Sequence, residues 1–211
     1  MTRFILVRHG ETAWNASGRI QGHTDIELTE KGLEQARLAA ESLRNENIDA
    51  VYSSDLKRAS VTAEAIATIH NLPVITTPLL REAFFGSWQG MNHLEIAEKY
   101  PNEYEAYKKD SIANRPPGAE HLEEVIARCA RYLKETTAAH PDQCVAVGCH
   151  GGSVRGILAA AFGMGPELYR RVRLDNGGIT IIEIDNGKPL LEKLNDTCHV
   201  SGLVIGSGAD Q

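Results

Sequence analysis

Four apolar residues near the start of the chain lead directly into an arginine, a histidine and a glycine, in the stretch Phe4-Ile5-Leu6-Val7-Arg8-His9-Gly10. Residues 144–152 (CVAVGCHGG) have the same design, with a second histidine after the apolar run. Continuous apolar runs are typical of strands that are covered on both faces. Ligands of open α/β sheets bind at the carboxyl ends of such strands. We therefore expect both histidines to lie at a binding site.

Short β-branched or aromatic runs alternate along the chain with longer segments of helical periodicity. The expected strands are residues 4–7, 49–52, 73–76, 144–147, 179–184 and 190–194, with the first and fourth at the centre of the sheet. Alternation of this kind predicts βαβ units around a mostly parallel sheet. Asn186-Gly187 separates the last two strands and predicts a hairpin, which adds an antiparallel edge strand. The expected fold is a three-layer α/β/α sandwich.

Three helical segments carry apolar stripes that we expect to face the core. The stripes consist of Leu33, Ala36, Ala40 and Leu43; of Leu56, Ala59, Ala63 and Ile66; and of Leu122, Val125, Ile126, Cys129 and Leu133. A different pattern, aromatic and then polar, runs from about residue 84 to 118 and includes the expected helices 92–100 and 103–109. We interpret it as a lid-like insertion in a single domain of residues 1–200, followed by a flexible tail of residues 201–211.

Composition and charge exclude several classes of protein. The 211 residues carry 22 Lys and Arg against 28 Asp and Glu, which gives a formal net charge of −6 and makes a nucleic-acid partner improbable. No apolar run is long enough to span a membrane, and no export signal is visible, so we expect a cytoplasmic protein. The four cysteines show no CxxC spacing and are expected to be reduced. A metal site at Cys149-His150 and Cys198-His199 is the weaker alternative, and we expect no metal and no cofactor.

Glycines and arginines around the two histidines indicate an anion-binding site. Gly151-Gly152 opens a predicted helix, where backbone N–H groups and the helix dipole favour an anion. Lys57 and Arg58 fall in the first turn of another helix, where the dipole disfavours cations. Asp55 partly compensates for Lys57, but a phosphate held by Arg8, Arg58 and both imidazoles accounts for more of these residues.

Cleavage of a phosphate ester also needs a proton donor, because an alkoxide is a poor leaving group. Glu82 lies between the apolar stretch 78–80 and the aromatic stretch 84–88, in surroundings that disfavour an ionised carboxylate. The alternative is a surface Glu82 paired with Arg81. Spacing alone does not decide between the two.

Six motifs, taken in order along nearly the whole chain, resemble those of the histidine phosphatase superfamily, phosphoglycerate mutase-like branch. They are residues 6–15 (LVRHGETAWN), 18–22 (GRIQG), 28–32 (LTEKG), 53–59 (SSDLKRA), Glu82 with 86–90 (GSWQG), and 150–152 (HGG). The resemblance implies a phosphoglycerate mutase-like fold and a metal-independent phosphomonoesterase that hydrolyses small phosphorylated metabolites.

The resemblance also implies roles for individual residues. His9 is the nucleophile that takes up the phosphoryl group, and Glu82 is the proton donor and later the base for water. The remaining catalytic residues are Arg8, Arg58 and His150, and the substrate-binding residues are Arg8, Asn15, Gln21, Gly22, Arg58, His150 and Gly151. A neutral imidazole is available as a nucleophile near pH 7, and cations neutralise the transferring phosphoryl group.

Two enzyme classes use these same residues, since mutases return the phosphoryl group to a phosphoglycerate. Residues 83–120 have a net charge of −2 and contain Phe84, Phe85, Trp88 and Met91. We therefore expect the phosphatase branch with a more apolar leaving-group pocket. The alternatives are a phosphoglycerate mutase, an α-ribazole phosphate phosphatase of cobalamin synthesis, and a non-catalytic phosphate-binding module. A homodimer is the one assembly that we consider.

Overall fold

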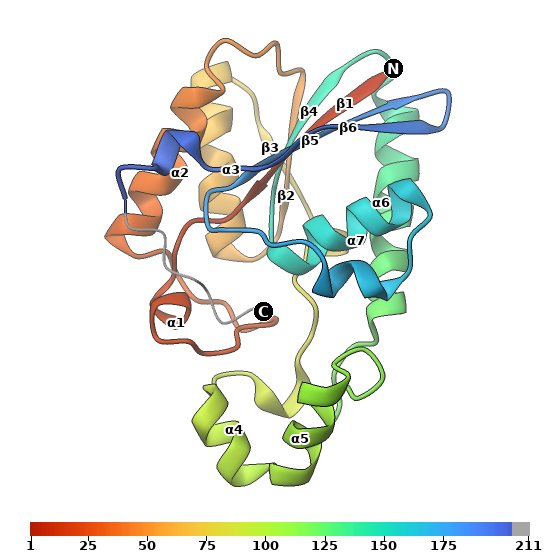
Figure 1. Cartoon of the computed structure of the whole chain (residues 1–211). Helices are drawn as coiled ribbons and strands as arrows, with labels where there is room; N and C mark the ends of the chain where they lie inside the picture. Colours follow the sequence, from red (N-terminus) through yellow and green to blue (C-terminus); the bar gives the residue numbers. More distant parts are fainter. Residues whose placement is uncertain (204–211) are drawn as a thin grey trace.

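The computed structural model describes residues 1–203, and it is a three-layer α/β/α sandwich around a six-stranded sheet (Figure 1). The strands are β1 Thr2–Arg8, β2 Ala50–Ser54, β3 Val74–Thr77, β4 Cys144–Cys149, β5 Ile179–Asp185 and β6 Lys188–Asp196. The α-helices are α1 Ala13–Ala16, α2 Glu30–Ser42, α3 Lys57–His70, α4 His93–Lys99, α5 Pro101–Lys109, α6 Leu122–Ala139 and α7 Gly151–Phe162. Short 3₁₀ turns are η1 Pro78–Leu80, η2 Gly86–Trp88, η3 Pro166–Arg170 and η4 Cys198–Val200.

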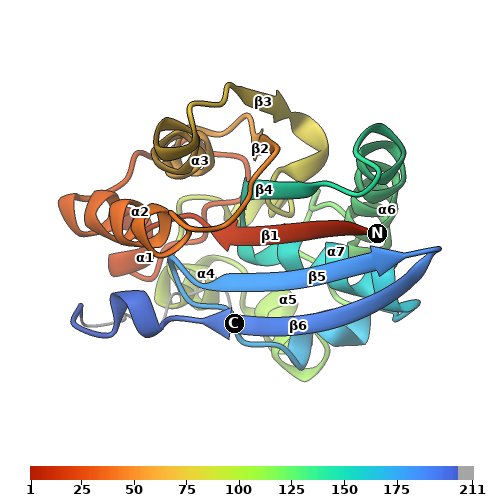
Figure 2. The same cartoon turned by 90° about the horizontal axis from the view of Figure 1, so that it is seen from above.

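The sheet has the strand order β3-β2-β4-β1-β5-β6, which Figure 2 shows from above. The first four strands are mutually parallel, whereas β5 runs antiparallel to both β1 and β6. All six strands were predicted, and β1 and β4 are the central pair as expected. Asn186 and Gly187 connect β5 to β6 with φ values of 48° and 75°, as a type I′ hairpin turn requires.

The two faces of the sheet are covered by different helices, as alternating strand side chains require. Phe4 and Leu6 of β1 pack with α6 and α7, whereas Ile5 and Val7 pack with α2 and α3. Figure 1 shows these helix pairs on opposite sides of the sheet. Leu33 is an exception to the predicted stripes, because it is 49% exposed near the start of α2. Ile126 of α6 is only half-buried.

Helices α4 and α5 lie apart from the sheet, beyond the carboxyl ends of β1 and β4 (Figure 1). Asn92 begins this helical pair by accepting hydrogen bonds from the backbone of Leu94 at 2.9 Å and of Glu95 at 3.0 Å. Trp88 and Ile96 form a small core with Ile20 that is separate from the two cores of the sandwich. That this segment acts as a lid within a single domain stays a prediction.

The predictions of a flexible tail and of no membrane span can be compared with the structure only for residues 1–203. Of the expected tail, residues 204–211 lie outside the described part of the structure, and residues 201–203 form a turn. Within residues 1–203, no helix combines the length and the apolar character that crossing a membrane requires.

Candidate active site

The two histidines of the sequence motifs meet because of the register between the central strands. Arg8 of β1 lies opposite Cys149 of β4, so the residues that follow, His9 and His150, lie side by side. Their ring centroids are 5.1 Å apart in an edge-to-face arrangement. The backbone N–H of His9 also donates to the carbonyl of Cys149 at 2.9 Å. Both side chains are buried at the carboxyl ends of the strands, as the sequence predicts.

The protonation of His9 follows from its hydrogen bond. Its Nδ1 lies 2.7 Å from the carbonyl oxygen of Gly10, which only accepts, so Nδ1 carries the proton. The lone pair of Nε2 is therefore the one available to an electrophile. Asn176 holds this loop, because its Nδ2 donates to the carbonyls of His9 at 3.0 Å and Gly10 at 3.3 Å. Sequence reasoning missed Asn176, which comes after a loop far along the chain.

Two buried arginines surround the histidine pair. Arg8 donates from Nη1 to the carbonyl of Leu174. Arg58 donates from Nη1 to the carbonyl of Thr24 at 2.9 Å and from Nη2 to that of Gly22 at 2.8 Å. The loop that holds Gly22 is thus fixed against the guanidinium of Arg58. Both arginines were predicted, and the structure brings them to the same place.

Burial and the nearby arginines keep both imidazoles neutral. Desolvation lowers the pKa of His9 well below its usual value, and the charges of Arg58 and Arg8 lower it further. The pKa of His150 is also lowered well below its usual value, mainly by burial and then by Arg58. Neither ring nitrogen of His150 has a hydrogen-bond partner among the described residues. A buried polar group of this kind is suited to a polar ligand.

Glu82 is buried and does not pair with Arg81. Its Oε1 accepts from the backbone N–H of Ala83 at 2.7 Å, and its Oε2 accepts from that of Gly152 at 3.1 Å. Arg81 instead binds Asp55, with Nη2 at 2.6 Å from Oδ2. The surface alternative for Glu82 is therefore wrong. The contact with Gly152 places the carboxyl group at the start of α7, two residues from His150.

The backbone of Glu82 is held by two side chains that sequence reasoning did not assign to it. His23 contacts the Glu82 carbonyl through Nε2 at 2.8 Å, and Arg128 donates to the same oxygen from Nη2 at 3.0 Å. Arg128 also forms an ion pair with Glu120 at 2.8 Å. The imidazole of His23 thus binds the backbone beside the Glu82 carboxyl group. No spacing signal identifies Arg128, which lies on a long amphipathic helix.

Asn15 and Gln21 are buried and share Thr12 as a partner. Asn15 Oδ1 accepts from the backbone N–H and the hydroxyl of Thr12, both at 3.1 Å, and so completes the capping box of α1, in which Thr12 is the N-cap. The Oε1 atom of Gln21 lies 2.9 Å from the same Thr12 hydroxyl. These contacts brace the loop after His9. Direct binding of a substrate by Asn15, Gln21, Gly22 and Gly151 stays a prediction.

The remaining candidates divide between the site and the surface. Lys57 is exposed and pairs with Glu27 at 3.2 Å, so of the two first-turn cations only Arg58 enters the site. Cys149 is buried among core residues, and burial raises the pKa of its thiol, which fits an unreactive packing role. Within residues 1–203, no group of three or more His, Cys, Asp or Glu side chains is arranged to hold a metal ion.

A cavity of about 550 Å³ adjoins Glu82 and Gly152. Six basic side chains line it: Lys108, Arg115, Arg155, Arg170, Arg171 and Arg173. The lining is mixed, because aromatic and aliphatic side chains such as Phe85, Tyr104, Tyr107 and Leu122 face the same space, so the more apolar leaving-group pocket stays a prediction. Four of the six cations follow α7 or lie in it, outside the segment whose charge we counted. Of the four expected residues Phe84, Phe85, Trp88 and Met91, Phe85 lines this cavity. Trp88 is instead buried against Tyr107, and their ring centroids are 5.0 Å apart.

Comparisons with known proteins place the chain in a family. A model of the family described as "Histidine phosphatase superfamily (branch 1)" matches residues 4–197. Phosphoserine phosphatase 1 of Hydrogenobacter thermophilus is 36% identical over 97% of this chain and 97% of its own length. The metal-independent phosphoserine phosphatase of Arabidopsis thaliana is 37% identical over 96% of this chain and 85% of its own. A mutant phosphoserine phosphatase of Entamoeba histolytica, solved in complex with phosphoserine, has a TM-score of 0.84 and 31% identity over 95% of this chain and 100% of its own.

Proposed function

The chain belongs to the histidine phosphatase superfamily and is a phosphoric monoester hydrolase, and we propose that it transfers the phosphoryl group of its substrate to Nε2 of His9. The observation that carries this proposal is the position of buried His9, whose Nδ1 faces the Gly10 carbonyl, beside buried Arg8 and Arg58, with Glu82 held at Gly152. This is the set of groups that phosphoryl transfer requires: a nucleophile, cations for the equatorial oxygens and an acid.

In the first half-reaction, Nε2 of His9 attacks phosphorus and the bond from phosphorus to the ester oxygen breaks. Glu82 gives its proton to that oxygen, so the product leaves as a neutral alcohol. Arg8, Arg58 and His150 bind the three phosphoryl oxygens. Both arginines are already held by backbone carbonyls, so little reorganisation is needed when charge develops.

In the second half-reaction, water attacks the phosphorus of phospho-His9. The Glu82 carboxylate, which lost its proton in the first step, takes a proton from this water. The bond from phosphorus to Nε2 breaks, inorganic phosphate leaves and neutral His9 is restored. Within residues 1–203, the donor set of the site contains arginine, histidine and the carboxyl group of Glu82, and the proposed chemistry uses no metal and no cofactor.

The substrate class follows from the cavity and from the relatives. Phosphoserine phosphatases are among the relatives, and one of them binds phosphoserine in its solved structure. We assign to this chain small monoesters whose alcohol part fits a cavity of about 550 Å³ lined by cations. The same cations favour a phosphoglycerate mutase as the second candidate, since a mutase must hold a substrate carboxylate. The cation-rich lining gives no support to an α-ribazole phosphate substrate.

A phosphate-release screen over a panel of phosphomonoesters tests this function, with His9→Ala as the inactive control. We expect release by the wild-type chain and none by the variant, whose folding is checked by circular dichroism. In parallel, mutase activity is measured as the formation of 2-phosphoglycerate when the chain is given 3-phosphoglycerate together with the bisphosphate. Efficient interconversion without phosphate release would assign the mutase instead. Activity retained by His9→Ala would contradict the proposed nucleophile.

A cytoplasmic location and a homodimer remain proposals. Sedimentation velocity of the purified chain tests the homodimer. A single species at the mass of one chain, 23.0 kDa, would exclude the dimer.

A further inference from the structure

The position of the cavity relative to Glu82 identifies the part of the substrate that it receives. This step rests on the proposed function, in which Glu82 protonates the ester oxygen. That oxygen joins the phosphoryl group to the alcohol part of the substrate. The cavity is lined by Glu82 and Gly152 but not by His9 or His150. It therefore receives the leaving group, and its chemistry selects among leaving groups.

Two of the six lining cations are held in place by the fold. Arg155 is buried, and its Nε donates to the carbonyl of Val172 at 2.9 Å. Arg115 donates from Nε to the carbonyl of Glu120 at 3.2 Å and lies over the ring of Phe85, 5.0 Å from its centroid. The buried Nη2 of Arg115 has no hydrogen-bond partner among the described residues, and burial lowers the pKa of this guanidinium. An anionic ligand would satisfy it.

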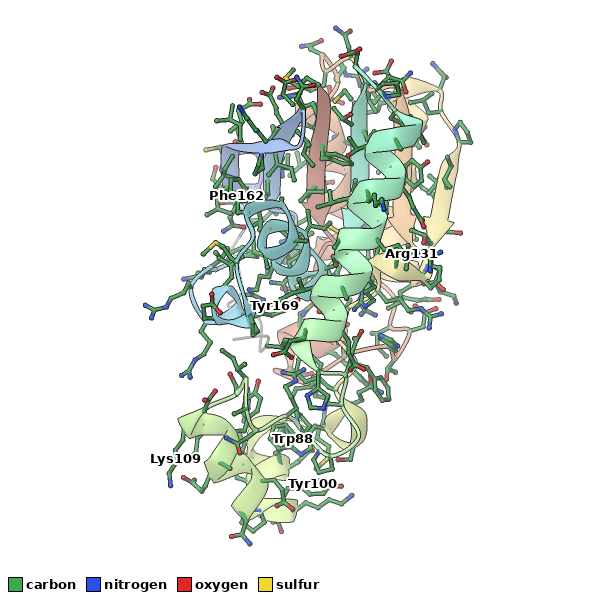
Figure 3. All side chains as sticks on the ribbon, turned by 90° about the vertical axis from the view of Figure 1, so that its right-hand side faces the viewer. Trp88, Tyr100, Lys109, Arg131, Phe162 and Tyr169 are labelled. Atoms are coloured by element: carbon green, nitrogen blue, oxygen red, sulfur yellow. The ribbon has the colours of Figure 1, made fainter. Side chains whose placement is uncertain are left out.

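Of the other four cations, Lys108 of α5 pairs with Glu105, and the remaining three come from the segment after α7, which is tied to the catalytic turn. Tyr169 of η3 donates from its hydroxyl to the carbonyl of Gly152 at 2.9 Å. Figure 3 shows Tyr169 below α7, on the side toward the insertion that carries Trp88. Arg170, Arg171 and Arg173 follow Tyr169 in the chain and line the same cavity. This tie keeps their charges next to the leaving-group side of Glu82.

Among residues 1–203, the lining of the cavity offers no ionised carboxylate to an ammonium group in the proposed first step. Glu82 is the one acidic side chain among the described residues that line the cavity, and in the proposed first step it carries the proton that the ester oxygen receives, so it offers no negative charge to an ammonium group. Asp175, beside Arg173, pairs with that arginine at 3.2 Å. Asp110, beside the lining residue Ser111, accepts from the backbone of the two residues after Ser111, at 3.0 and 3.2 Å.

We propose that this chain prefers phosphorylated hydroxy acids, whose alcohol part carries a carboxylate and no ammonium group, over phosphoserine. The carboxylate pairs with the cations of the cavity. The α-ammonium group of phosphoserine would face the same cations without an ionised acidic partner among the described lining residues, and like charges at close range are repulsive. The preference thus differs from the substrate in the names of the phosphoserine phosphatases to which the chain is similar.

Two matched pairs of substrates test the proposal, because each pair exchanges an ammonium group for a hydroxyl. One pair is phosphoserine and 3-phosphoglycerate, and the other is phosphoethanolamine and 2-hydroxyethyl phosphate. We expect kcat/KM for phosphate release to be at least about 10-fold higher for 3-phosphoglycerate than for phosphoserine, and higher for 2-hydroxyethyl phosphate than for phosphoethanolamine. Among the four, 3-phosphoglycerate should be best. Equal or higher kcat/KM for phosphoserine would overturn the proposal.

Variants locate the source of the preference. The double variant Arg170→Gln/Arg171→Gln should reduce the ratio of kcat/KM for 3-phosphoglycerate to that for phosphoserine by about 5-fold or more, mainly through KM. The control Arg44→Gln/Arg131→Gln changes the net charge equally at exposed residues away from the cavity, and should leave the ratio unchanged. Equal ratios in both double variants would refute the assignment to this cavity. Failure of the proposed function is distinguishable, because no substrate, including p-nitrophenyl phosphate, would then release phosphate.

Discussion

The backbone N–H of Gly152 donates to Glu82 Oε2 at 3.1 Å, and a Cβ atom on Gly152 would lie 1.8 Å from Oε1 of the same carboxyl group. The turn that follows His150 therefore needs glycine at this position, because the acid occupies the space of the absent side chain. The start of α7 and the proposed proton donor are in this way a single structural unit.

Gly152→Ala should displace the Glu82 carboxyl group and lower kcat for alkyl phosphates by about 10²- to 10⁴-fold, the usual contribution of a general acid. Steady-state kinetics with 3-phosphoglycerate measures the loss. Gly202→Ala serves as the control, since a Cβ on Gly202 meets nothing within 4 Å. A Gly152→Ala enzyme with normal turnover would show that the carboxyl position is not important.

Glu82→Gln should slow turnover of alkyl phosphates far more than turnover of p-nitrophenyl phosphate. The nitrophenolate group leaves without a proton, whereas an alkoxide needs one. The ratio of kcat values for the two substrates, in wild type and variant, measures the difference. An equal loss on both substrates contradicts the assignment of Glu82 as the acid for the leaving group.

The stability of the fold should decrease as the pH falls below about 6.5, the usual pKa of histidine. His9 and His150 have folded-state pKa values well below that value, so below it the unfolded chain binds more protons than the folded chain. Each histidine then contributes up to about 1.4 kcal/mol per pH unit to the loss. Urea unfolding at pH 7 and 5.5 measures it. A His9→Asn/His150→Asn variant should lose less stability over this interval, and an unchanged loss would contradict the two low pKa values.

Vanadate or inorganic phosphate at millimolar concentration should raise the melting temperature, because these anions bind the folded site and not the unfolded chain. Arg58→Ala should abolish the shift. It should also destabilise the ligand-free protein by about 1–3 kcal/mol, because the buried carbonyl of Gly22 loses its partner. Differential scanning fluorimetry measures both effects. An Arg58→Ala protein with a wild-type ligand shift would show that the anion binds elsewhere.

Treatment with EDTA should leave phosphate release unchanged, because the proposed steps use only His9, His150, Glu82 and two arginines. The assay compares chelated enzyme with enzyme to which divalent cations have been returned. Activity that is lost on chelation and restored by a metal would contradict this prediction and favour the alternative of a metal site at Cys149-His150 and Cys198-His199.

Much of the fold was predictable because its signals are local. Residues 4–7 and 144–147 are apolar runs that only doubly covered strands tolerate, and they are the central strands β1 and β4. The Asn186-Gly187 turn requires positive φ at both residues, which this pair allows. The prediction for Leu33 was wrong because the inward-facing residue of the first turn of α2 is Gly32, which is buried against the backbone of Gly10 and Glu11.

The proposed catalytic residues were predictable for a related reason. His9 and His150 each follow a central strand, so the register of two neighbouring strands brings them together. Asn176 and Arg128 were not predictable, since each acts through a backbone carbonyl of a distant segment. A carbonyl is present at every residue, and so the sequence contains no mark of which one a side chain will bind.

The positive charge of the cavity lining could not be predicted from sequence patterns. The insertion has an acidic composition, yet the cavity beside it is cationic, because α7 and the segment after it supply Arg155, Arg170, Arg171 and Arg173. Strand, turn and phosphate-site motifs act over a few neighbouring residues and can be read along the chain. The charge of a cavity is a sum over side chains that come from separate segments, and it exists only when the chain has folded.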